Sequence, residues 1–287
     1  MAKMNRRLWF SVIVMLVTGM GFYSASNADN ERKLSVTTMQ LAADMAEVRQ
    51  SRILFSHHSV GANILEGVKR LDAESPGSDR LRVASIEEAF ATKEPALIDF
   101  WGGQNGEPKT KIDSFAAVIR SEPRLKLDIA FMKFCYVDFN PRTDVNELFG
   151  YYRSTLDALK REHPEIRFAH VTVPLTTWPT GMKWRIFRII GKEVWEDDAN
   201  IKRAEFNRRL QESFSSDPVL DLARLEATAP DGHLTTFERG GQSYLSLYPG
   251  YTDDGGHLNT LGQQIVGVAA VRFMAEGLNG RRFTKAK

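Results

Sequence analysis

The sequence predicts an α/β protein with a parallel sheet covered by helices on both faces. Two observations carry this prediction. From residue 52 to about residue 276, short apolar runs alternate with longer segments in which apolar residues recur every three or four positions. Such alternation of strands and helices is typical of sheets built from parallel crossover units. A chain of 287 residues, 43% of them hydrophobic, is also long enough to bury one sizeable core.

Five segments are predicted as strands of this sheet. The first is continuously apolar through Ile53, Leu54 and Phe55 and then stops abruptly in polar residues. The third alternates at first and becomes mostly apolar, which suits a strand buried on both faces. In chain order the predicted strands are residues 52–58, 81–86, 125–134, 166–173 and 219–225.

Helical spacing of apolar residues marks the segments between the strands. Directly after Ser59, the residues Ile64, Leu65, Val68 and Leu71 share one helical face. Further helices are predicted at residues 30–50, 112–119, 144–162, 199–215 and 260–274. Two long connections remain, at 176–198 and 227–259, and long connections of this kind are uncommon unless they are functional.

The N-terminus has the three parts of a secretory signal. Lys3, Arg6 and Arg7 precede an apolar run at 8–23, and small residues follow at 24–28. We therefore predict a signal peptide at 1–28 and an exported protein, periplasmic or secreted, with an uncleaved membrane anchor as the alternative. One domain is predicted at 29–279, and a basic tail at 280–287.

Charge and cysteine content exclude several classes of protein. The net charge of +2 argues against nucleic-acid binding, which usually requires a concentrated basic face. Cys135 is the only cysteine, so the chain can form no intramolecular disulfide and no cysteine-based zinc cage. Neither a metal ion nor an organic cofactor is expected.

Ser59 is the predicted nucleophile. Ligands of open α/β sheets bind in the crevice beyond the carboxyl ends of the strands, and Ser59 directly follows the first strand. Its backbone N–H would lie at the N-terminus of the next helix, where developing negative charge is stabilised.

A second signal is the segment 252–259, directly before the last predicted helix. Two glycines between Asp254 and His257 allow the tight turn through which the carboxylate and the imidazole can meet. This arrangement suits a general base whose tautomer is fixed by an acidic partner. The alternative is a polar loop in which the aspartates cap turns and the histidine is solvated.

Together, these segments resemble the SGNH/GDSL hydrolase superfamily. The resemblance covers about residues 52–276, and the match of Asp254-Gly255-Gly256-His257 is its most specific part. It implies a flavodoxin-like three-layer α/β/α fold with a five-stranded parallel sheet and a serine ester hydrolase activity. By position, Ser59 would be the nucleophile, His257 the base and Asp254 its partner. Backbone N–H groups of Ser59 and of Gly106 or Gly103 would form the oxyanion hole.

The sequence departs from the family pattern at two places. The first block reads His57-His58-Ser59-Val60 in place of Gly-Asp-Ser-Leu, and the third block lacks the usual asparagine, with Cys135 in that region. Losing one oxyanion donor costs about 10²–10³ in turnover, so a substitute is expected. The candidates are Asn140, Tyr136, His57 and His58. Asp138 has the alternative role of bonding the loop around Ser59.

Several residues are candidates for substrate binding. His58 lies next to Ser59, and Trp101, Trp178 and Trp184 have side chains that can stack on sugar rings. The segment 182–195 has the pattern of a basic amphipathic helix, which suits a lid or a membrane-surface contact. The alternative for this segment is a helix docked on the domain with its basic side in water.

The favoured function is an exported serine esterase that removes acyl groups, with an O-acetylated glycan as a suitable substrate. An O-acyltransferase would use the same site. A non-catalytic glycan-binding or envelope-assembly protein on the same fold is the main alternative, and the missing asparagine supports it. A metal-dependent hydrolase is a third alternative, with its ligands drawn from His57, His58, Asp253, Asp254 and His257. A cysteine mechanism at Cys135 is disfavoured because a cysteine flanked by apolar residues usually packs as a small hydrophobe.

Overall fold

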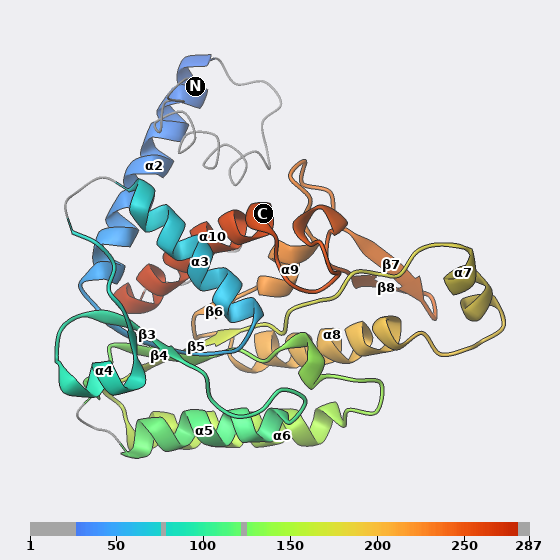
Figure 1. Cartoon of the computed structure of the whole chain (residues 1–287), viewed down its shortest axis with the longest axis horizontal. Coiled ribbons are helices and arrows are strands. Elements are labelled where there is room, and N and C mark those ends of the chain that lie inside the picture. Colours follow the sequence, from blue (N-terminus) through green and yellow to red (C-terminus); the bar gives the residue numbers. More distant parts are fainter. Residues whose placement is uncertain (1–26, 76–78, 122–124, 281–287) are drawn as a thin grey trace.

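The computed structural model describes residues 27–75, 79–121 and 125–280, with side chains from residue 37 onward (Figure 1). The predicted signal peptide therefore lies almost entirely outside the described residues, as does the basic tail after Gly280. Helix α2 (Asn27–Arg49) matches the predicted helix at 30–50 and buries Leu41, Met45 and Val48.

A parallel sheet of six strands forms the centre of the fold, in the spatial order β2-β3-β1-β4-β5-β6. β1, which precedes Ser59, lies between β3 and β4 and is hydrogen-bonded to both. The strands are β1 (Arg52–Ser56), β2 (Val83–Ser85), β3 (Ala96–Phe100), β4 (Ile129–Met132), β5 (Arg167–Val171) and β6 (Val219–Leu220).

The predicted number of five strands was wrong, because β3 was missed. This segment, Ala-Leu-Ile-Asp-Phe, has only three consecutive apolar residues before Asp99, too few to stand out by periodicity. It is a strand because β1 and β2 pair with it on its two sides. Without the edge strand β2, the order of the remaining five strands is that of flavodoxin-like sheets.

Helices cover both faces of the sheet, as predicted, and complete three layers (Figure 1). Ile53 and Phe55 of β1 pack toward one face and Leu54 toward the other, because successive side chains of a strand alternate. The first face is covered by α2, α3 (Val60–Glu74) and α10 (Thr260–Asn279); the second is covered by α5 (Pro108–Ser121), α6 (Val145–Glu162) and α8 (Trp195–Ser213).

The helices that follow the two predicted catalytic segments pack directly against each other. A Cβ added to Gly267 of α10 would lie 2.5 Å from the backbone of Gly67 in α3, so only glycine permits this approach. In addition, the Leu258 N–H donates to Oδ1 of Asn63, in the first turn of α3, at 3.0 Å. The two contacts fix the segment around His257 relative to the start of α3.

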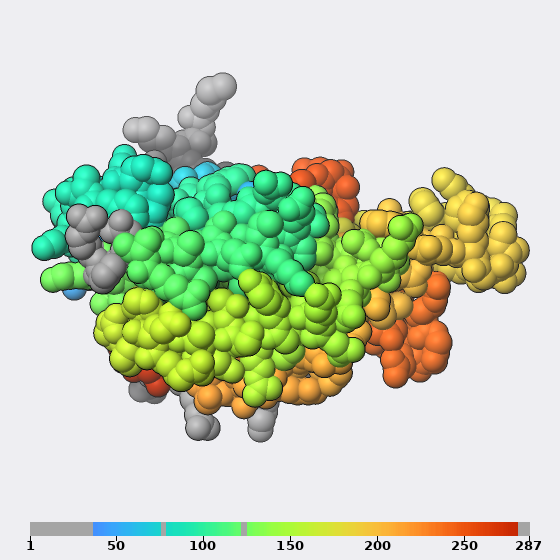
Figure 2. Space-filling view, turned by 90° about the horizontal axis from the view of Figure 1, so that it is seen from below, coloured from blue at the N-terminus to red at the C-terminus, as the bar shows by residue number. Residues whose placement is uncertain are grey.

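The two long connections contain short elements of their own. The first holds α7 (Met182–Ile189), which projects from one end of the molecule (Figure 2). After β6, the chain forms α9 (Leu222–Ala227), so the predicted strand at 219–225 was too long. The remaining short elements are α4 (Ile86–Ala91), the 3₁₀ turns η2 (Tyr136–Asp138) and η3 (Pro249–Tyr251), and a hairpin of β7 (Thr236–Arg239) and β8 (Gln242–Leu245). Within the described ranges, every helix is too short or too polar to span a lipid bilayer.

Candidate active site

Ser59 lies at the carboxyl edge of the sheet, between β1 and α3. It occupies the N-cap position of α3, but its hydroxyl makes no capping hydrogen bond and so stays available for chemistry. The polar neighbour of Ser59 Oγ is Cys135 Sγ, at 3.8 Å. Gly61 admits the buried ring of His57, because a Cβ there would lie 2.4 Å from that side chain. The start of α3 is thereby packed closely onto the end of β1.

His257 and Asp254 meet through the tight turn that the two glycines allow. His257 Nδ1 lies 2.6 Å from Asp254 Oδ2, while Asp254 Oδ1 accepts from the backbone N–H groups of Gly256 and His257 at 2.9 and 2.8 Å. Gly255 has a φ of +88°, a conformation that L side chains rarely adopt. Because the carboxylate accepts at Nδ1, that nitrogen carries the ring proton and Nε2 is left as the basic atom.

The charge of Asp254 is stabilised by its own loop. Partial burial acts to raise the pKa of Asp254, but hydrogen bonds from the His257 ring and from two backbone N–H groups outweigh it. The pKa of Asp254 therefore lies well below its usual value, and the carboxylate is ionised at neutral pH.

A third segment, which follows β4, connects Ser59 with His257. Cys135 contacts the Ser59 hydroxyl, and the next residue, Tyr136, places its hydroxyl 3.4 Å from both ring nitrogens of His257. Gly256 allows this approach, since a Cβ there would lie 2.7 Å from the Tyr136 ring. The buried Arg203 holds the segment by donating to the Tyr136 carbonyl at 2.8 Å. Among the described residues, Ser59 makes no direct hydrogen bond to His257.

The two glycines expected in the oxyanion hole differ in availability. The Gly106 N–H donates to Asp138 Oδ1 at 2.9 Å, so the expectation that it faces the oxyanion is not met in this structure. The reason is that the buried Asp138 carboxylate needs donors, and the loop supplies one. The Gly103 N–H makes no hydrogen bond to another described residue, and Gly103 packs against the backbone of Lys111 with a φ of +73°.

The candidates for the missing third donor are also placed by the structure. Asn140 is used locally: its Oδ1 accepts from the Arg142 N–H at 2.8 Å, which closes a turn after η2. Asp138 does not bond the Ser59 loop; it accepts from the N–H of Cys135 at 2.6 Å and from Gly106. The Tyr136 hydroxyl lies 3.4 Å from the ring nitrogens of His257.

His57 and His58 have separate partners. Nε2 of the buried His57 is 3.0 Å from Asp99 Oδ1, and burial lowers the pKa of His57. Nε2 of His58 instead lies 3.0 Å from the Gly102 carbonyl oxygen. The residues considered as metal ligands are thus divided between different partners, and no group of three or more His, Cys, Asp or Glu side chains suited to a metal gathers among the described residues.

Of the three candidate tryptophans, Trp101 contacts the residues around Ser59. Its ring packs edge-on against His58 with 5.3 Å between centroids, and the side chain is 54% exposed. Trp178 is stacked against Phe237 and the Arg188 guanidinium, and Trp184 belongs to the projecting helix α7. Trp101 is therefore the candidate that packs against the two histidines that precede Ser59.

The sequence analysis missed Asn63, Asn105, Lys111 and Arg203. The contacts of Asn63, Lys111 and Arg203 join segments far apart in the chain, and Asn105 is placed by its contact with Lys111, so no local pattern marks these residues. A lysine within an otherwise apolar stripe, as Lys111 is beside Ile112 and Phe115, is the one signal that was present.

The comparisons with known proteins concern the fold. No protein-family model matches the sequence, and no curated protein matches it. A solved structure described as a GDSL-like lipase from Parabacteroides merdae is 15% identical, with 80% of this chain and 97% of that chain covered at a TM-score of 0.44. The periplasmic domain of a lipopolysaccharide acetyltransferase from Salmonella ser. Paratyphi A is 11% identical, with 92% and 95% covered at 0.40.

A third solved structure, described as a platelet activating factor from Streptococcus pneumonia, is 16% identical, with 87% and 100% covered at a TM-score of 0.41. The chain has a three-layer α/β/α fold, as its own sheet order and helix packing show. The residues of its candidate site are assigned from the distances and hydrogen bonds within this chain.

Proposed function

We propose that this protein is an exported serine ester hydrolase with Ser59 as nucleophile, His257 as general base and Asp254 as the carboxylate that orients it. The observation that supports this most directly is the convergence of three segments at the carboxyl edge of the sheet. Contacts run from Ser59 through Cys135 and Tyr136 to His257, and from His257 to Asp254.

In the proposed reaction, Ser59 Oγ attacks the ester carbonyl carbon while His257 Nε2 accepts the hydroxyl proton. The tetrahedral intermediate collapses when the imidazolium returns this proton to the leaving alcohol, which yields an acyl-serine. Water, deprotonated by His257, then releases the carboxylic acid and restores Ser59. Asp254 keeps the proton on Nδ1 throughout.

This reaction requires Ser59 Oγ and His257 Nε2 to come within hydrogen-bond distance. Catalytic hydrogen bonds are often long in the free enzyme and tighten when substrate binds. The Ser59 side chain is not held by a cap, so rotation about its Cα–Cβ bond is not opposed by a strong hydrogen bond.

An O-acetylated glycan is the substrate class that we favour. The exposed Trp101 ring beside the Ser59 loop offers a flat apolar surface of the kind on which a sugar ring stacks. A sugar hydroxyl that replaced water in the second step would make the enzyme an O-acyltransferase. A non-catalytic glycan-binding protein would keep the stacking surface without the chemistry.

The test is covalent labelling with a fluorophosphonate, followed by mapping of the labelled peptide. We expect the label on Ser59, no label in Ser59→Ala, and loss of acetyl-ester turnover in that variant with an unchanged melting temperature. Ser56→Ala is the matched control, because Ser56 is a buried residue of β1 three positions away. Absence of label from the folded wild-type protein would refute the esterase, and activity that survives in Ser59→Ala but is lost with a chelator would favour the metal-dependent hydrolase.

We also propose that residues 182–195 contact an anionic membrane surface, and the exposure of α7 supports this proposal. Met182, Ile189 and Ile190 are 69%, 80% and 66% exposed on the projecting segment, and Arg185 is exposed beside them. Apolar residues next to basic ones suit the boundary between lipid headgroups and acyl chains. We expect Ile189→Asp/Ile190→Asp to lower sedimentation with phosphatidylglycerol vesicles several-fold. Met39→Asp, an exposed apolar residue on α2, should have no effect, and equal sedimentation of all variants would contradict the proposal.

A further inference from the structure

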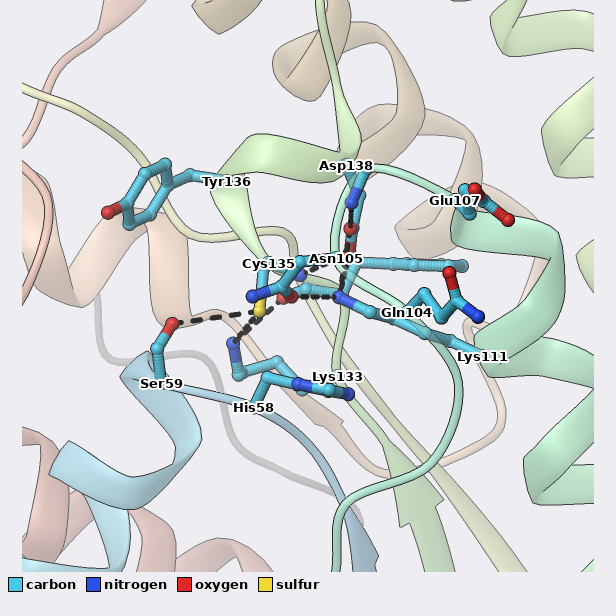
Figure 3. A network of polar contacts seen from close by, with 12 residues as sticks. His58, Ser59, Gln104, Asn105, Glu107, Lys111, Lys133, Cys135, Tyr136 and Asp138 are labelled. Carbon is cyan, nitrogen blue, oxygen red and sulfur yellow. Dashed lines mark hydrogen bonds and ion pairs between the residues drawn. The ribbon is translucent and has the colours of Figure 1, made fainter.

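The loop between β3 and α5 holds an asparagine against a buried ion pair. Lys111 and Asp138 are 1% and 2% exposed, and their side chains pair at 2.6 Å. Lys111 Nζ also donates to Asn105 Oδ1 at 2.8 Å (Figure 3). An ammonium that donates to both Asp138 oxygens and to one amide oxygen has used its three protons, so the network is complete on the lysine side.

The lysine fixes which way the Asn105 amide points. An ammonium has donors and no acceptor, so the amide atom that faces Lys111 must be the oxygen, and Nδ2 with its two protons lies on the other side. Asn105 is exposed at the surface of the loop, and its Nδ2 donates to no other described residue. Bonding of a cation to the amide oxygen further polarises the amide and strengthens Nδ2 as a donor.

The same carboxylate ties this amide to the neighbourhood of the nucleophile. Asp138 Oδ2 accepts from the Cys135 N–H at 2.6 Å, and Cys135 Sγ lies 3.8 Å from Ser59 Oγ. Figure 3 shows the Asn105 amide on the side of the network that faces Cys135 and Ser59, whereas the Gln104 side chain points away toward Glu107. The Lys111–Asp138 pair therefore joins two segments, one after each strand that flanks β1, and the segment after β4 contacts the serine through Cys135.

We propose that Asn105 Nδ2 is an oxyanion donor of this site, and that Lys111 and Asp138 are its positioning residues. The donor would come from the loop after β3. The segment after β4, which contains Cys135, would not supply it. The buried ion pair would compensate for the flexibility of a loop amide by holding its oxygen. In the tetrahedral intermediate the carbonyl oxygen gains a full negative charge, and Nδ2 would hydrogen-bond to this oxygen more strongly than to the neutral ester.

This inference rests on the proposed function, and a single series of measurements separates the two. The variants are Asn105→Ala, Asn105→Asp and, as matched control, Gln104→Ala on the same loop. Readouts are the second-order rate of fluorophosphonate labelling at Ser59, kcat and KM for an acetyl ester, and the melting temperature. Asn105→Asp keeps an oxygen for Lys111 but replaces the donor by an acceptor, so it tests the donor separately from the shape of the loop.

We expect Asn105→Ala and Asn105→Asp to lower kcat and the labelling rate about 10²–10³-fold, with KM changed less than threefold and the melting temperature within a few degrees of wild type. Gln104→Ala should match wild type. The inference is overturned if either Asn105 variant is labelled within threefold of the wild-type rate, if the loss is confined to KM, or if Gln104→Ala shows the same loss. A wild-type protein that is not labelled at all overturns the esterase itself, and the role of Asn105 with it.

Discussion

Replacement of His257 by alanine is expected to lower kcat for an acetyl ester by about 10⁴–10⁶-fold, the range seen when the base of a serine triad is removed. The reason is that no other described imidazole can take its place. His57 is buried against Asp99, and His58 is held at the Gly102 carbonyl. Steady-state turnover of the purified variant, with the melting temperature as a check on folding, measures this effect.

The aspartate pair beside His257 provides a sharp control. Asp254→Asn should lower kcat about 10⁴-fold, because an amide in place of the carboxylate favours the wrong imidazole tautomer. Asp253→Asn should leave kcat unchanged, since the contact of Asp253 is a long one, 3.5 Å from Asn259 Nδ2, and not with the ring. Equal effects of the two substitutions would contradict the assigned geometry.

Replacement of Lys111 by methionine is expected to lower the free energy of unfolding by about 3–5 kcal/mol, the cost of leaving one charge of a buried pair without its partner. Methionine fills much of the lysine volume, so the loss would come from the unpaired Asp138 carboxylate. After the substitution, this carboxylate keeps two backbone donors, the Cys135 and Gly106 N–H groups. Urea unfolding at neutral pH measures the change.

A second lysine on the same helix is the matched control. Lys109 pairs with Glu147 at 2.6 Å, but both side chains are exposed, so Lys109→Met should cost about 0–1 kcal/mol. The double variant Lys111→Met/Asp138→Asn should be more stable than Lys111→Met alone, because no buried charge remains, although the single asparagine oxygen can accept from only one of the two backbone N–H groups. If Lys111→Met cost no more than Lys109→Met, the ion pair would not stabilise the fold.

Some elements of this fold could be predicted from the sequence, and others could not. Long amphipathic helices such as α3 and α6 follow from apolar spacing, because burial of one stripe against a sheet imposes that spacing. β1 was readable because a central parallel strand is apolar on both faces. β3 was not, because it owes its state to hydrogen bonds with β1 and β2 on its two sides.

The candidate site likewise has features that could be predicted from the sequence and features that could not. The pairing of Asp254 with His257 could be predicted because the residues are three positions apart and two glycines allow the turn. The expected role of Gly106 could not be checked from spacing, and the structure shows its N–H bound to Asp138, which lies 32 positions away.

The sequence by itself determined the layered α/β fold, the serine at the end of the first strand and the local Asp-His pair, since each depends on residues close together in the chain. Only the tertiary structure determined which residue contacts Ser59 and which way the Asn105 amide points. It also determined that Asn63 of α3 accepts a hydrogen bond from the Leu258 N–H and so holds the His257 loop. The physical reason is that buried polar groups must find hydrogen-bond partners, and their partners come from whichever segments the packing of the core brings near.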